Sequence, residues 1–125
     1  MNKKNNYDVE AHQGATFLRR FVFAGTGPHG THSLEDSRVR LHVLRENAEG
    51  PLEIECDLDN QRLTLLDAKN GLLQWKLAPQ DTQGIKFPKG EDHLDCVYSI
   101  EITDRDGDIH VPVRAAFRLY RSITR

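Results

Sequence analysis

The stretch that decides the fold is Asp95-Cys-Val-Tyr98-Ser-Ile100-Glu-Ile102-Thr-Asp104-Arg-Asp-Gly107-Asp-Ile109, in the last third of the chain. Apolar and polar side chains alternate before the turn, which places three residues on one face of a strand: Tyr98, Ile100 and Ile102. The run ends in Asp106-Gly107, a dipeptide typical of the type I′ hairpin turn, whose two central residues both take positive φ. A second extended run, from Ile109 to Leu119, then leads back. This stretch predicts an antiparallel β-hairpin.

Similar alternation recurs upstream between turn signals. Val39, Leu41 and Val43 share one face of a strand at 38–45, and Leu52, Ile54 and Cys56 share one face of the next. We expect further strands at 16–23, 62–66 and 72–77, the last burying Trp75. The one helical candidate covers 78–83, with Pro79 at its first position. About seven to eight short strands with regular turns predict an all-β chain, an antiparallel immunoglobulin-like β-sandwich, with a flattened barrel as the alternative.

Composition narrows the function classes. The chain has 125 residues, of which 38% are hydrophobic and 29% charged, and its net charge is −2. That balance provides no electrostatic surface for nucleic acid or for an anionic membrane, so neither is expected as a partner. No apolar run approaches a transmembrane helix in length. Met1–Tyr7 has two lysines but no apolar stretch behind them, so a signal peptide is not predicted. We therefore expect the chain to be made and kept in a cytoplasm unless a larger assembly carries it out.

The cysteines do not follow the immunoglobulin pattern. In that fold a tryptophan comes soon after the first cysteine, and a tyrosine lies two residues before the second. Here Trp75 lies about midway between Cys56 and Cys96, and the position two before Cys96 is Leu94. Without an export signal, two buried free thiols are favoured over a disulfide.

Residues 1–12 are polar and show no apolar periodicity, so we predict a flexible N-terminal arm followed by a single β-sandwich domain at 13–125. Removing residues 1–10 is then expected to leave the melting temperature nearly unchanged.

The order of segments over residues 13–125 resembles a family of small bacteriophage virion proteins. These are β-sandwich domains of tail and baseplate components, including the N-terminal domain of siphophage upper baseplate proteins. The resemblance begins at 13–17 and 21–23 and continues through the Arg-Val-Arg-Leu strand at 38–43. It then follows a spaced set of residues: Gly71, Leu77, Thr82, Pro88, Gly90, Tyr98, Ile100, Glu101, Ile102, Thr103, Asp104, Asp106 and Gly107.

The resemblance implies a structural role. It predicts a virion component of a tail, baseplate or neck, assembled in the bacterial host cytoplasm and without enzyme activity. The implied partners are other tail, baseplate or fibre proteins, with the chain as an oligomerising adaptor that forms a homo-oligomeric ring. The alternative is a standalone immunoglobulin-like binding module of the adhesin or carbohydrate-binding type, which needs an exposed aromatic platform.

Reactive side chains do not form a recognisable site in the sequence, and we predict no catalytic, cofactor-binding or metal-binding residues. His29 and His32 lack further ligands at zinc spacing. The Asp104–Asp108 run lacks the EF-hand positions of glycine and glutamate, so a hairpin turn is favoured over a calcium loop. The acid pairs Glu53/Glu55 and Glu91/Asp92 are expected on solvent faces or in turns.

Two basic stripes are candidates for contact with a neighbour: Arg38, Arg40 and Arg45, and Arg114, Arg118, Arg121 and Arg125. Ordinary solubility and protection of sheet edges by charge is the favoured interpretation. The two ends of the chain, at 2–10 and 120–125, are the stronger candidates for docking, as short extended tails that add strands to neighbouring subunits.

Overall fold

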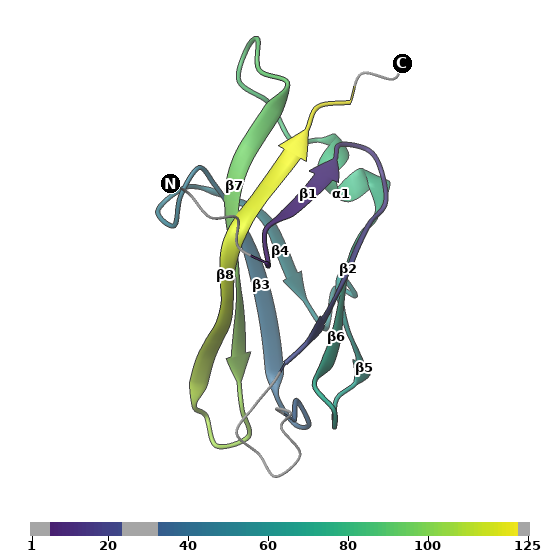
Figure 1. Ribbon diagram of the computed structural model, residues 1–125, viewed down its shortest axis with the longest axis vertical. Helices are drawn as coiled ribbons and strands as arrows, with labels where there is room; N and C mark the ends of the chain where they lie inside the picture. Colours follow the sequence, from purple (N-terminus) through teal and green to yellow (C-terminus); the bar gives the residue numbers. More distant parts are fainter. Residues whose placement is uncertain (1–5, 24–32, 123–125) are drawn as a thin grey trace.

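The computed structural model describes residues 6–23 and 33–122, and these form two packed β-sheets (Figure 1). The larger sheet has five strands in the order β1 (Val9–His12), β8 (Ile109–Tyr120), β7 (His93–Thr103), β3 (Arg38–Arg45), β4 (Leu52–Asp57). The smaller has three, in the order β2 (Phe17–Val22), β6 (Leu72–Leu77), β5 (Leu63–Asp67). β1 runs parallel to β8, and the other pairs in the described ranges are antiparallel. The all-β sandwich predicted from the sequence is confirmed.

The core lies between the two sheets and is centred on Trp75. This side chain projects from β6, is fully buried, and packs against rings of the facing sheet, 5.0 Å from Tyr98 and 5.6 Å from Phe117 between centroids. The predicted faces of β3 and β7 are confirmed, because Val39, Leu41, Val43, Tyr98, Ile100 and Ile102 are all buried. The alternation of apolar and polar residues predicts burial correctly on these strands because each sheet has one face against the other sheet.

The β7–β8 hairpin forms as predicted, but its turn is of another type. The Gly107 amide donates to the Asp104 carbonyl at 3.0 Å, and the Asp104 amide donates to the Asp108 carbonyl at 2.9 Å. Gly107 has a φ of +87°, whereas Asp106 is not among the described residues with positive φ. The loop is therefore a type I turn closed by a left-handed glycine, and the predicted two-residue type I′ turn is wrong.

The N-terminal segment corrects a second prediction. Residues 9–12 form β1 instead of a flexible arm, with Val9 and Ala11 buried against the core and a four-residue parallel pairing to β8. Upstream, the Tyr98 hydroxyl donates to the Tyr7 carbonyl, and the Ala116 amide donates to the Asp8 carboxylate at 2.8 Å. Residues 1–5 of the predicted arm lie outside the described residues. Because β1 buries apolar side chains, removing residues 1–10 is now expected to destabilise the fold.

Leu52 is a third correction. It is exposed, although parity placed it with Ile54 and Cys56 on the inward face. The β3–β4 register shifts between Val43 and Leu44, so that β4 carries one extra residue, Glu53, between Leu52 and Ile54. A β-bulge of this kind reverses the parity across the extra residue, so Leu52 and Ile54 lie on opposite faces.

The smaller sheet and its connections complete the sandwich. Arg19 lies on the edge strand β2, and its guanidinium donates to the Asn6 carbonyl at 2.9 Å. The predicted helical turn is α1 (Pro79–Gln83), with Pro79 at the helix start. Among the residues that the structure describes, no helix is long and apolar enough to cross a membrane.

Candidate functional site

Arg38 and Arg40 of the first predicted basic stripe lie on the outer face of the larger sheet, but the outward placement of Arg45 is wrong, because Arg45 is opposite buried Cys96 in the β3–β7 pairing. Arg40 contacts Glu101 at 2.6 Å, and this hydrogen-bonded ion pair raises the pKa of the Arg40 guanidinium. Arg45 contacts Glu53 at 2.5 Å and also donates to the Lys86 carbonyl at 2.7 Å. Arg38 is exposed at the start of β3. The three arginines therefore do not form one stripe: Arg40 belongs to a mixed-charge outer face, and Arg45 is engaged by Glu53 and the Lys86 carbonyl.

The second stripe is divided among different contacts. Arg118 contacts Asp95 at 2.7 Å, which raises the pKa of the Arg118 guanidinium. Arg121 lies over the Phe87 ring, 5.4 Å from its centroid, and donates to the Pro88 carbonyl at 3.3 Å. Arg114 is exposed on β8, and Arg125 lies outside the described residues. The outward placement predicted from parity is confirmed for Arg114 and Arg118, but Arg121 follows the end of β8 on the parity of buried Leu119.

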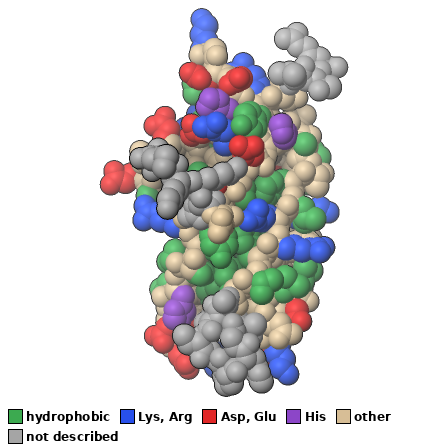
Figure 2. Space-filling view, viewed as in Figure 1, with side chains coloured by type: hydrophobic (Ala, Val, Ile, Leu, Met, Phe, Trp, Pro, Cys, Tyr) green, Lys and Arg blue, Asp and Glu red, His purple; other side chains and the backbone are tan. Residues whose placement is uncertain are grey.

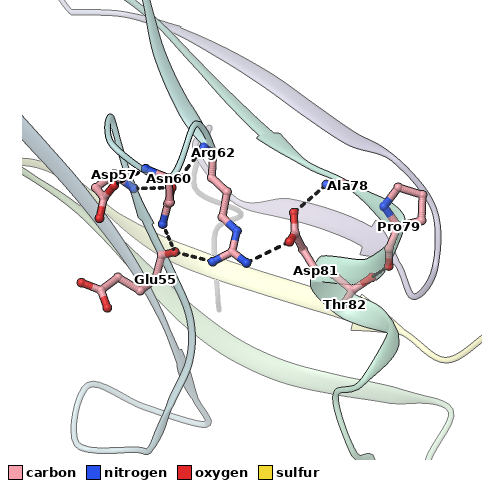
Figure 3. Close-up of polar contacts among 8 residues, drawn as sticks. All are labelled: Glu55, Asp57, Asn60, Arg62, Ala78, Pro79, Asp81 and Thr82. Atoms are coloured by element: carbon pink, nitrogen blue, oxygen red, sulfur yellow. Dashed lines mark hydrogen bonds and ion pairs between the residues drawn. The ribbon is translucent and has the colours of Figure 1, made fainter.

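A connected polar group is centred on Arg62, at the entry to β5 (Figure 3). One guanidinium nitrogen donates to the Glu55 carbonyl at 2.8 Å, and another contacts the Asp81 carboxylate at 2.9 Å. The second oxygen of Asp81 accepts the Ala78 amide at 2.7 Å, at the start of α1. Asp81 is only 12% exposed, and both of its carboxylate oxygens are engaged by these contacts.

This Arg62 network joins the end of the larger sheet to the helical turn. Asn60 adds to it, because its side chain donates to the Glu55 carbonyl at 2.9 Å and accepts the Arg62 amide at 3.1 Å. In Figure 3 the Arg62 guanidinium lies between the Glu55 carbonyl and the Asp81 carboxylate, so the network holds these elements together. An acid whose two oxygens are already bonded in this way is poorly placed to transfer protons.

The loop of the β7–β8 hairpin uses its first carboxylate in the same internal manner. Asp104 accepts a hydrogen bond from the amides of Asp106 and Asp108 and pairs with His110 at 3.1 Å. The His110 contact, followed by these amides, holds the pKa of Asp104 below its ordinary value. The predicted hairpin turn is confirmed for this run, with the first carboxylate bonded inside the loop. Within 6–23 and 33–122, no cluster of His, Cys, Asp and Glu is arranged to hold a metal, and His29 and His32 lie outside those ranges.

The two cysteines are buried free thiols, as predicted. Burial raises the pKa of Cys56 to about 12 and that of Cys96 to about 11. A thiol with so high a pKa is almost entirely protonated at neutral pH and is a poor nucleophile.

A row of aromatic side chains crosses the outer face of the larger sheet, and the sequence pattern does not predict it. Tyr120 of β8 stacks on His12 of β1 at 5.3 Å and lies 6.3 Å from His93 of β7. The Asp92 carboxylate contacts His93 at 2.8 Å, which holds the pKa of Asp92 below its ordinary value. The alternation along β8 predicts that Tyr120 lies on the outer face. Its contact with His12 depends on the pairing of β8 with β1, which the alternation does not predict.

The outer face of the smaller sheet is apolar and basic, and we call it the β2–β6–β5 face. Leu18 is 53% exposed, Val22 63% and Leu66 42%. Arg20 and Lys76 lie on the same face, since Arg20 is opposite Gln74 and Lys76 is opposite Leu18 in the β2–β6 pairing. Figure 2 shows hydrophobic and basic side chains along the side of the molecule that this sheet forms. Exposed aliphatic side chains gathered in this way are typical of a protein-binding surface.

Comparison with known proteins identifies no family model that matches the chain and no curated protein with significant similarity to it.

Proposed function

We propose that the chain is a structural virion component of a bacteriophage tail, baseplate or neck, acting as an oligomerising adaptor between virion proteins. The observation that carries the proposal is the surface of the sandwich. Apart from Leu52 on β4, the exposed large aliphatic side chains of the described residues lie on the β2–β6–β5 face and beside the β7–β8 loop, where they are available for contact with other proteins. Its partners would be other tail, baseplate or fibre proteins.

The residues behind the phage resemblance are consistent with a scaffold. Gly71, Gly90 and Gly107 all take positive φ, the backbone conformation that glycine adopts without strain. Tyr98, Ile100 and Ile102 belong to the buried core. These residues account for a shared fold, and the virion role follows from the resemblance as an analogy.

We also propose that the sandwich is immunoglobulin-like. The strand order supports this, because the second, sixth and fifth strands form one sheet while the eighth, seventh, third and fourth form the other. That arrangement corresponds to the B-E-D and G-F-C-C′ strands of variable-type domains. Rigid sandwiches with loops at both ends commonly present those loops to partners.

A non-enzymatic role is part of the proposal. The strongest polar groups described above, the Arg62 network and Asp104, have their atoms engaged within the fold. Binding through a preformed surface requires only that the sandwich stay rigid.

The test is genetic and structural. In a phage that encodes the chain, deletion of its gene should give particles with absent or defective tails in negative-stain electron microscopy, and a plasmid copy should restore them. A plasmid copy carrying Trp75→Ala, which removes the core anchor, is the matched control for loss of fold. Normal infectious particles without the chain would contradict the proposal.

The alternative, a standalone immunoglobulin-like binding module, is favoured by one feature, the aromatic row of His12, Tyr120 and His93. Carboxylates flank it, since the Tyr120 hydroxyl lies 3.5 Å from Glu10 and His93 contacts Asp92. Aromatic rings beside carboxylates can hold a sugar by stacking and hydrogen bonding. A glycan array probed with the parent and with Tyr120→Ala separates the two roles, because only the binding module predicts glycan signals that this substitution abolishes.

A further inference from the structure

The β7–β8 loop carries a second exposed apolar patch, which we call the hairpin tip. Ile109 is 63% exposed and Val111 is 55% exposed, and they follow directly after the loop that contains Asp104, Asp106 and Asp108. Asp36 adjoins it through its contact with Arg105 at 3.6 Å. The tip therefore combines aliphatic side chains with an excess of carboxylates.

The β2–β6–β5 face has the complementary composition. Its exposed aliphatic residues, Leu18, Val22 and Leu66, lie among the cations of Arg20 and Lys76. Asp67, a carboxylate at the end of this face, is engaged by the side chain and amide of Asn70 in the β5–β6 turn. The two surfaces are complementary, because both are apolar while one carries cations and the other carries carboxylates.

The two patches lie at different places on the molecule. In Figure 1 the β7–β8 loop is at the lower end of the long axis, whereas β2, β6 and β5 form the right-hand side. A contact between unlike patches of identical chains is heterologous, and repeated contacts of this kind give a ring when the rotation closes.

We propose that the hairpin tip of one copy docks on the β2–β6–β5 face of a second copy, so that the chain self-associates head to tail. The inference rests on the proposed function and names the contact by which its ring would form. Ile109 and Val111 lie on the exposed aliphatic residues of the neighbouring sheet, and the carboxylates of Asp106 and Asp108 approach Arg20 and Lys76.

Each contact is small. The exposed aliphatic side chains are three on the face and two on the tip, whereas stable interfaces use about 20–30 residues on each side. A single contact is therefore weak, and association becomes strong only when ring closure or a tail partner makes several contacts at once. The salt concentration matters as well, because the charged part of the contact is exposed and screened.

The test is sedimentation velocity of the purified chain at low salt, over a concentration series up to about 1 mM, the range in which weak contacts form. Val22→Glu alters the face and Ile109→Glu alters the tip. Leu52→Glu is the matched control, because Leu52 is equally an exposed aliphatic residue but lies on β4, outside both patches. We expect the parent and Leu52→Glu to associate with rising concentration, and the other two variants to sediment as monomers with unchanged thermal melting.

Mixing the two monomeric variants gives the decisive result. Val22→Glu retains an intact tip and Ile109→Glu retains an intact face, so their mixture should form a dimer and nothing larger. No dimer in the mixture, equal loss in the Leu52→Glu control, or a parent that stays monomeric would each overturn head-to-tail docking.

These outcomes are separable from the proposed function. A parent that is monomeric in solution but present in purified particles would overturn the contact and leave the virion role standing. A parent that associates as described but is absent from particles would support the contact and overturn the virion role.

Discussion

Val9→Ala tests whether β1 is an integral strand of the larger sheet or a loose arm. Val9 is 6% exposed on the inward face of β1, opposite Phe117 in the β1–β8 pairing. The substitution removes two buried methyl groups, worth about 0.8 kcal/mol each by transfer, and leaves a small cavity. The expected loss is about 2 kcal/mol of unfolding free energy, which for a domain of this size lowers the Tm by roughly 8 °C.

The assay is thermal unfolding followed by circular dichroism, with urea unfolding to obtain the free energy. Glu10→Ala is the matched control, because Glu10 is the next residue of the same strand but is exposed on the outer face. It should change the unfolding free energy by less than about 0.5 kcal/mol. If Val9→Ala melts with the parent, residues 9–12 do not pack on the core and the arm interpretation is restored. If both variants lose stability equally, the strand is held by its backbone, and the burial of Val9 is irrelevant.

Four further outcomes follow from the core, the loop, the polar network and the thiols. Trp75→Ala should cost about 3–5 kcal/mol in urea unfolding because the side chain is fully buried between the sheets; a Tm within two degrees of the parent would mean that the residue is exposed. Gly107→Val should cost at least about 1 kcal/mol purely through its φ of +87°, since a Cβ there meets no neighbour, and Gly107→Asn should cost less; equal stability of both variants would remove the turn assignment. Arg62→Met should cost about 2 kcal/mol, less than a fully buried pair because Arg62 is 33% exposed, and combining it with Asp81→Asn should cost less than the sum of the single changes; strict additivity in this double-mutant cycle would mean that the two side chains do not interact. The pKa of Cys56 is raised from 9.0 to about 12, so its contribution to stability is complete below pH 9 and is lost between pH 9 and 12, where the unfolded thiol ionises and the folded one does not; urea unfolding across this range should show a shallower pH dependence in Cys56→Val, and identical slopes would mean that the thiol is not buried.

The sequence was informative wherever alternation and packing agree. Val39, Leu41 and Val43 on β3, and Tyr98, Ile100 and Ile102 on β7, lie on central strands with one face against the other sheet, so parity alone predicts their burial. Trp75 follows the same rule on β6.

The failures have identifiable physical causes. β1 carries only two apolar residues, Val9 and Ala11, which is too short a pattern to recognise, and its stability comes from pairing with the far end of the chain. Leu52 was predicted to face inward because counting alternate residues does not reveal the extra residue at the bulge. The Asp106-Gly107 pair is compatible with more than one turn, and the backbone conformation decides between them.

The candidate surfaces were predicted less well than the fold. Arg38, Arg40, Arg114 and Arg118 were placed on their faces, whereas Arg45 and Arg121 were not, since both have the parity of buried residues at the end of a strand. The carboxylate partners come from neighbouring strands, as Glu101 does for Arg40. The exposed side chains of the β2–β6–β5 face alternate with inward phenylalanines, so Leu18 and Val22 were visible in the sequence as outward positions. Their meeting with Leu66 depends on the sheet order, which a single sequence does not give.

The measurement that tests the proposed virion role most directly is quantitative mass spectrometry of purified phage particles from a strain that encodes the chain. We expect peptides of the chain at a fixed multiple of the tail tip proteins, retained through gradient purification and lost from particles that lack tails. Absence of the chain from intact, infectious particles, or a trace amount that varies between preparations, would contradict a structural role in the virion.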